Sequence, residues 1–202
     1  MLTENGSLQL QDFTDRNFQE AFTQVTEGVW HVSGLGHSNA VVLEGNTGVI
    51  LIDALDTLER GEKLLHFIRE KTGKEVKTVI FTHSHPDHRG GAGAFLGSAP
   101  EIIAFAPKTP ALEGSELLQQ IQNRRGSRQF GYTLTDEENI SQGIGRREGV
   151  VYGEHRAFTA PSTVYQEDSV SREIDGITMA VFPTFTPSGA DSTATYRPGR
   201  KA

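Results

Sequence analysis

Short runs of apolar residues, separated by turn-forming residues, recur along the first half of the chain. Residues 29–32 alternate apolar and polar side chains, as a half-buried strand does. Two β-rich runs at 39–44 and 49–53 flank the tetrapeptide at 45–48, whose asparagine and glycines favour a tight turn. The pattern therefore predicts one strand followed by a β-hairpin.

A helical period replaces the alternation at residues 57–72. Leu58, Leu65 and Ile68 fall on one face of the predicted helix, and most of the charged residues fall elsewhere. Thr57 is suited to cap the start of this helix, and Gly73 to end it.

Residues 78–81 are short, rich in β-branched side chains and apolar, which is typical of a strand buried on both faces. The same reasoning makes 102–105 a buried strand, and 112–121 shows a helical pattern. Three further strands are predicted at 163–165, 170–174 and 177–182, the last two joined by an Asp175-Gly176 turn. Strands followed by alternating strands and helices predict an α/β sandwich, in which helices cover sheets.

Residues 122–160 lack a clear period, and glycines interrupt them repeatedly. Connections of this length in a compact domain are usually functional or disordered. Arg124 and Arg125 offer forked donors to an anionic head group such as sulfate. A solvated pair of loop charges is the simpler interpretation.

The length of 202 residues suits one domain with a full core. We expect a polar N-terminal lead-in at 1–24, docked through Phe13, Phe18 and Phe22, and a single domain at 25–202. The net charge of -7 and a pI near 5.5 argue against a nucleic-acid partner. Because the chain has no cysteine, any metal must be held by histidine and carboxylate side chains.

The first residues are polar and acidic, without the basic start and apolar core of a signal peptide. No run approaches the roughly 20 apolar residues of a membrane span. The sequence therefore predicts a soluble, cytoplasmic protein, with a periplasmic location left open if the N-terminus is incomplete.

The most informative segment is His83-Ser84-His85-Pro86-Asp87-His88, which follows the predicted strand at 78–81. Imidazole and carboxylate groups suit zinc, and a catalytic zinc keeps one position open for water. Side chains two apart on extended chain point the same way, so His83 and His85 can bind one ion. Asp87 and His88 lie beyond the strand end, where a loop can turn them toward a second ion. A solvated polar loop is the alternative.

This segment resembles the His-X-His-X-Asp-His signature of the metallo-β-lactamase superfamily. The chain before it agrees with the resemblance, because a turn at 46–48, a strand ending in Asp53 and a helix precede the motif strand. Within the superfamily the chain looks most like the alkyl sulfatases. The segments that support this branch are Ser38-Asn39-Ala40 leading into 43–48, Arg124-Arg125, Gly143-Ile144-Gly145, Pro161-Ser162-Thr163, 174–177 and Thr186-Pro187-Ser188-Gly189.

The resemblance implies a four-layered αββα sandwich with the metals at one sheet edge. It implies that His83 and His85 bind a first zinc, that Asp87 and His88 bind a second, and that catalytic Asp87 orients the attacking water. Thr82 and Asp53 are candidates for orienting the imidazoles from outside the metal site, or are simply hydrogen-bonded strand ends.

The second half of the chain departs from the superfamily pattern, which requires further ligands there. Asp191 is the one carboxylate in the matching segment, and it sits imperfectly. His155 precedes the Asp175-Gly176 strand pair and is a weak candidate for the third ligand. The resemblance thus predicts a fold incomplete at the C-terminus. A fragment or a truncated product is favoured over a short homologue with rebuilt ligands.

The resulting hypothesis is a zinc-dependent hydrolase that uses metal-bound hydroxide to cleave an ester, with two zinc ions in a complete site and one or two here. A small-molecule alkyl sulfate ester, with an apolar tail, is the favoured substrate. One alternative is a generic hydrolase of this fold acting on a carboxylic ester, thioester or lactam. Another is a non-catalytic metal-binding remnant, because second-half ligands are absent.

Overall fold

The computed structural model describes residues 2–106, 116–129, 131, 133–135, 137–141, 143–185 and 192–198. Its first half contains α1 (Leu2–Asn17), β1 (Ala21–Thr26), β2 (Val29–Ser33), β3 (Ala40–Glu44), β4 (Val49–Ile52), α2 (Leu58–Thr72), β5 (Val76–Ile80), α3 (Pro86–Arg89), the 3-10 helix η1 (Ala92–Ser98) and β6 (Glu101–Phe105). Its second half contains α4 (Glu116–Gln129), the 3-10 helix η2 (Gly149–Tyr152), β7 (Thr163–Tyr165), β8 (Val170–Ile174), β9 (Ile177–Phe185) and β10 (Ser192–Pro198).

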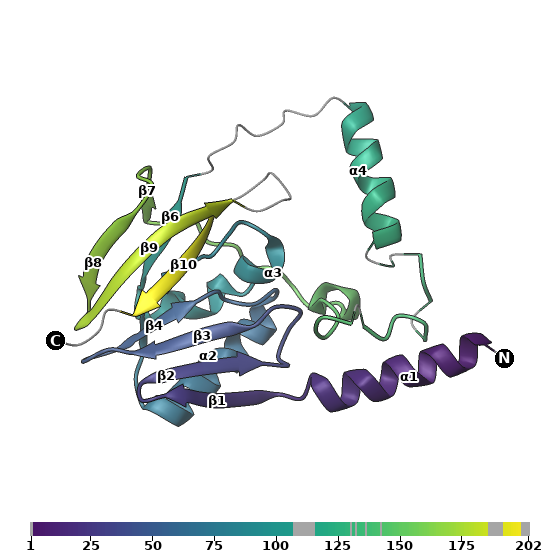
Figure 1. Ribbon diagram of the computed structural model, residues 1–202, viewed down its shortest axis with the longest axis horizontal. Coiled ribbons are helices and arrows are strands. Elements are labelled where there is room, and N and C mark those ends of the chain that lie inside the picture. Colours follow the sequence, from purple (N-terminus) through teal and green to yellow (C-terminus); the bar gives the residue numbers. More distant parts are fainter. Residues whose placement is uncertain are drawn as a thin grey trace.

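The described strands form two sheets (Figure 1). The larger sheet has the order β1-β2-β3-β4-β5-β6-β7. Its first four strands are antiparallel, and β4 to β7 are parallel. The smaller sheet is antiparallel, with β9 between β8 and β10.

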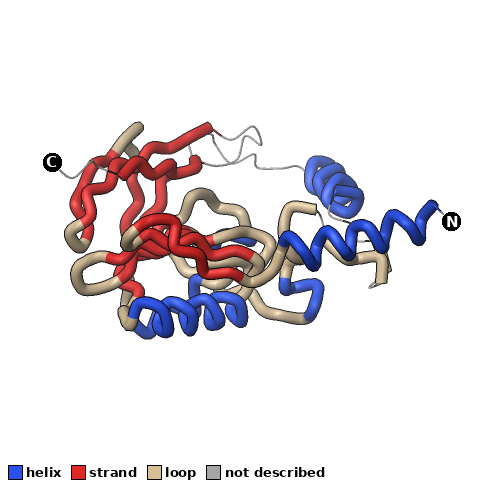
Figure 2. The backbone as a smooth tube through the Cα atoms, turned by 60° about the horizontal axis from the view of Figure 1, so that its bottom comes forward, coloured by secondary structure: helices blue, strands red, loops and turns tan. Residues whose placement is uncertain are grey.

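Two apolar cores lie on opposite faces of the larger sheet. One face packs on α2 and η1 through buried side chains that include Leu51, Leu64 and Phe95. The other face packs on the smaller sheet, where Ile50 and Met179 share a core. Helices, large sheet and small sheet are thus stacked in that order (Figure 2), which confirms the predicted α/β sandwich.

The strands and helix predicted from clean periodicity are confirmed. The hairpin forms between β3 and β4, and α2 ends at Gly73, which adopts a left-handed conformation with φ 66°. Thr57 occupies the N-cap position, but its hydroxyl makes no capping bond and donates to Glu154 instead.

The N-terminal segment is more ordered than a polar lead-in suggests. It forms α1 and then enters β1, which pairs with β2 from Ala21 onward. Phe22 packs on Trp30 with ring centroids 5.1 Å apart, whereas Phe13 and Phe18 pack on each other. The segment therefore contributes an edge strand to the sheet.

The helix predicted at 112–121 extends further along the chain. Among the described residues it begins at Glu116 and continues to Gln129, so Arg124 and Arg125 lie on an exposed helix and not in a loop. Residues 112–115 lie outside the described residues. No described helix is long and apolar enough to cross a membrane.

The two sheets are also joined by a polar contact between their hairpin turns. The carboxylate of Asp175 accepts hydrogen bonds from the backbone N–H groups of Thr47, at 2.9 Å, and Gly48, at 2.7 Å. The backbone N–H of Asn46 donates to the backbone carbonyl of Asp175 at 2.9 Å. Asp175 and Gly176 both have positive φ, as a type I′ hairpin turn requires. This contact lies where β4 begins. The histidine motif lies at the opposite end of these strands, beyond the C-terminal end of β5.

Candidate metal centre

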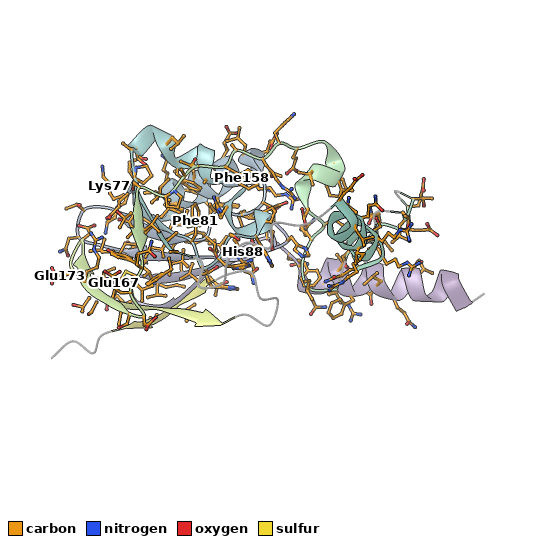
Figure 3. The ribbon with its side chains drawn as sticks, turned by 90° about the horizontal axis from the view of Figure 1, so that it is seen from above. Lys77, Phe81, His88, Phe158, Glu167 and Glu173 are labelled. Carbon is orange, nitrogen blue, oxygen red and sulfur yellow. The ribbon has the colours of Figure 1, made fainter. Side chains whose placement is uncertain are left out.

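The histidine motif begins where β5 leaves the sheet. The neighbouring strand β4 runs parallel to β5 and ends just before Asp53, so Asp53 and the motif meet at the same edge. Figure 3 shows Lys77 toward one end of β5, and Phe81 and His88 toward the other. Pro86 starts the short helix α3, which carries Asp87 and His88 out of the strand direction.

Asp53 contacts both Thr82, just before the motif, and His88 within it. Its carboxylate accepts hydrogen bonds from the Thr82 backbone N–H at 2.8 Å and from the Thr82 hydroxyl at 2.7 Å. The same carboxylate lies 2.7 Å from His88 Nδ1. Because a carboxylate only accepts, Nδ1 of His88 is the donor. Asp53 is 4% exposed and has a φ of 62°, which is unusual for a residue other than glycine.

The three motif imidazoles form a cluster. The ring centroid of His83 lies 3.9 Å from that of His88 and 4.6 Å from that of His85. Nδ1 of His83 lies 3.0 Å from the Thr82 hydroxyl, which already donates to Asp53. That hydroxyl can therefore accept a hydrogen bond from Nδ1–H of His83, and Nε2 of His83 is then the unprotonated nitrogen of the ring.

Asp87 completes the cluster from α3. Its Oδ2 lies 3.3 Å from Nε2 of His88, and the hydroxyl of buried Ser38 donates to its backbone carbonyl. Burial opposes the charged form of His88, but hydrogen bonds to Asp53 and Asp87 outweigh it and raise its pKa to about 9. Burial is the largest single influence on Asp87 and opposes its charge, but the hydrogen bond and charge of His88, a backbone hydrogen bond and the nearby His37 together outweigh it and lower the pKa of Asp87 to about 2. Burial lowers the pKa of His83.

The chemistry of these donors fits zinc. Imidazole nitrogen and carboxylate oxygen are zinc ligands, and Nδ1 of His88 is tied to a carboxylate in the manner of metal-binding histidines. Within the described part of the chain, however, no group of three or more His, Asp or Glu side chains is arranged to hold one ion. His88 Nε2 faces Asp87, so metal binding at these two residues must displace a proton and break their contact.

Two sequence candidates remain, Asp191 and His155. Asp191 is outside the described residues. The imidazole of His155 lies 2.9 Å from Glu59 and is 80% exposed, so its contact is with the start of α2 and not with the histidine cluster. Thr82 and Asp53, by contrast, do contact the motif imidazoles.

Two contributors to the site were not predicted from sequence. Ser38 bonds to the Asp87 backbone, and His37 lies close enough to favour the charged form of Asp87. Both lie about 50 positions before Asp87, as the separation of 49 for Ser38 shows, so no local pattern signals them. The one available signal was that Ser38 begins a segment resembling the alkyl sulfatases.

Comparison with known proteins agrees with this geometry. The yeast Saccharomyces cerevisiae alkyl/aryl-sulfatase BDS1 is 33% identical over 166 residues, which cover 76% of this chain and 25% of that protein. An (R)-specific secondary-alkylsulfatase of Pseudomonas is 25% identical over 164 residues, again 77% of this chain and 25% of the relative. The chain therefore spans about a quarter of the length of these relatives.

The fold is also found among solved structures. The sec-alkylsulfatase Pisa1 from Pseudomonas superimposes with a TM-score of 0.71 at 23% identity, covering 94% of this chain and 31% of Pisa1. The profile of the Metallo-beta-lactamase superfamily matches residues 33–188, from the end of β2 to beyond β9. This chain belongs to the metallo-beta-lactamase superfamily.

Proposed function

We propose that this chain is part of a zinc-dependent hydrolase that cleaves an ester bond, and that the substrate is an alkyl sulfate ester. The observation that carries the proposal is the cluster of His83, His85 and His88, contacted by Asp53 and Thr82 where the parallel strands β4 and β5 end. The choice of a sulfate ester is supported by the alkylsulfatases among the relatives.

In this proposal, His83, His85, Asp87 and His88 hold zinc, and Asp191 supplies a further carboxylate. Zinc held by these residues would supply Lewis-acid chemistry that makes water a nucleophile. Asp53 fixes His88 so that Nε2 faces the site, and Thr82 does the same for His83. The Asp87 carboxylate would accept a hydrogen bond from water and orient it.

A second candidate is a metal-binding domain without catalysis. It is favoured by the second half of the sequence, which departs from the superfamily pattern where further ligands are required. A hydrolase of carboxylic esters, thioesters or lactams is the other enzyme class, since metallo-beta-lactamases are also among the relatives.

The test is a paired assay of the full chain with zinc added, on dodecyl sulfate and on a chromogenic lactam, together with zinc content. Sulfate release with about two zinc ions per chain supports the proposal, whereas lactam cleavage alone supports the other enzyme class. Zinc without any turnover supports the non-catalytic domain. His85→Ala should abolish turnover, and His155→Ala, which changes an exposed imidazole, should not. Turnover that survives His85→Ala would overturn the metal mechanism.

A further inference from the structure

An ion network that is buried at Asp56 and Arg60 and part-exposed at Glu154 lies beside the histidine motif, and the proposed chemistry does not use it. Asp56 is 0% exposed and Arg60 is 8% exposed. Nη1 of Arg60 donates to both carboxylate oxygens of Asp56 at 3.1 Å, and Nε of Arg60 lies 3.0 Å from Glu154 Oε2. The Gly149 amide also donates to Asp56, at 2.6 Å. Burying ions costs solvation energy, so a buried network is weak evidence for stability alone.

One end of the network is continuous with the segment that supports the motif. The amide of Ala54 donates to the His88 carbonyl at 2.8 Å, and the Gly91 amide donates to the Leu55 carbonyl at 3.1 Å. Leu55 is fully buried and has a φ of 63°, a conformation that persists only where the surroundings enforce it. A Cβ atom at Gly90 would overlap the Asp56 carbonyl. Residues 53–56 are therefore in direct backbone contact with the motif loop.

The other end of the network is connected to the same loop through the 149–157 segment. The hydroxyl of Thr57 donates to Glu154 at 2.5 Å, which fastens the 149–157 segment to the start of α2. Three residues further on, the Ala157 amide donates to the Gly90 carbonyl at 2.6 Å. The backbone N–H of Gly93 donates to the Ala157 carbonyl at 2.8 Å. Arg60 thus links two chain segments that each hydrogen-bond to residues 88–93.

We propose that Arg60, Asp56 and Glu154 are positioning residues, which set the placement of the 83–91 loop and thereby its affinity for metal. The inference rests on the proposed function for the identity of the metal. The route for this effect is the set of backbone bonds at Ala54, Gly91 and Ala157, which join both ends of the network to the loop.

The test compares Glu154→Gln, Arg60→Lys and Arg60→Met in the full chain. The matched control is Glu75→Gln, which removes an exposed ion pair with Arg69 at the other end of α2. Zinc affinity is measured by competition with a chromophoric chelator, and the ligand field by cobalt absorption. Hydrogen exchange of the Ala54 and Gly91 amides is followed without added metal.

We expect Arg60→Met and Glu154→Gln to weaken zinc binding by about tenfold or more, the lower end of what loss of supporting contacts around a metal site costs. Arg60→Lys should recover part of that loss, and Glu75→Gln should bind zinc like the unaltered chain. The Ala54 and Gly91 amides should exchange faster in the two damaging variants alone. If Arg60→Met does not fold, the zinc affinity and amide exchange of Glu154→Gln decide whether the proposal holds.

Two results would overturn the inference. The first is zinc affinity and cobalt absorption unchanged in Glu154→Gln, even if its thermal stability falls, since that describes a merely structural contact. The second is unchanged exchange at Ala54 and Gly91. If the unaltered chain binds no zinc, the proposed function fails, and faster exchange in the variants would still support the positioning of the loop.

Discussion

Nδ1 of His88 lies 2.7 Å from Oδ2 of Asp53, across the edge where β4 and β5 end. The contact orients the His88 ring, and Asp53 also binds the backbone and hydroxyl of Thr82. Asp53→Asn should therefore weaken zinc binding by about 10–100-fold, because the amide cannot replace all of these acceptor roles. Chelator competition measures the loss. Asp15→Asn, on the exposed face of α1, is the control and should change nothing.

Zinc should stabilise the folded chain through the motif histidines. Metal that binds only the folded state stabilises it by a free energy that grows with the logarithm of the ratio of metal concentration to dissociation constant, and the midpoint of unfolding rises accordingly. We expect zinc to raise Tm by several degrees in the unaltered chain, and EDTA to reverse the rise. His85→Ala should show a much smaller shift in differential scanning fluorimetry. An equal shift in His85→Ala would mean that the stabilising metal binds elsewhere.

A methyl group at position 90 should disrupt the motif loop. Its Cβ would overlap the Asp56 backbone, which cannot move aside as a flexible side chain can. Gly90→Ala should destabilise the fold by about 1–3 kcal/mol, the usual cost of overpacking, as measured by urea unfolding. Gly97→Ala meets nothing within 4 Å and is the matched control. Similar unfolding curves for the two variants would contradict the loop packing.

The core between the large sheet and α2 should depend on Phe95. This ring is 1% exposed and belongs to the apolar cluster on that face. Phe95→Ala should cost about 3–5 kcal/mol of unfolding free energy, because it removes buried apolar area and leaves a cavity. Leu8→Ala, at a side chain 69% exposed on α1, should cost less than about 0.5 kcal/mol.

The contact of Asp175 with the β3–β4 turn should make stability fall in acid. Backbone hydrogen bonds from Thr47 and Gly48 hold the pKa of Asp175 below its ordinary value of 3.8. The contribution is therefore fully present above about pH 4 and is lost as the pH falls through the lowered pKa. Urea midpoints at pH 7 and pH 3 should differ less in Asp175→Asn than in the unaltered chain. If the midpoint falls equally in both proteins between pH 7 and pH 3, Asp175 does not contribute to the loss of stability in acid.

Periodicity predicted those elements that bury one regular face. The helix at Leu58–Thr72 was found for this reason, whereas the hairpin of β3 and β4 was found from two β-rich runs around a turn of asparagine and glycines. The strand β1 was not, because its residues are mostly exposed and show no apolar alternation. The later turns of α4 were missed because their side chains are almost all polar.

The candidate site likewise contains residues that the sequence predicts and contacts that it does not. The motif itself is local in sequence, so His83, His85, Asp87 and His88 were predicted directly, although their role as ligands stays a prediction. Sequence could not decide whether Asp53 orients an imidazole, since that depends on β4 and β5 being parallel neighbours. The network of Asp56, Arg60 and Glu154 spans almost a hundred positions, as the separation of 97 between Thr57 and Glu154 shows, and only the fold reveals it.

Every strand of the larger sheet after β1, from β2 to β7, pairs with the strand that precedes it in the chain. A ribosome that releases this chain from its N-terminus therefore always exposes the edge on which the next strand will pair. The sheet can grow by one strand at a time, without waiting for a distant segment to be inserted between strands already formed. Asp53 and the histidine motif would then come together early, as soon as β5 joins β4.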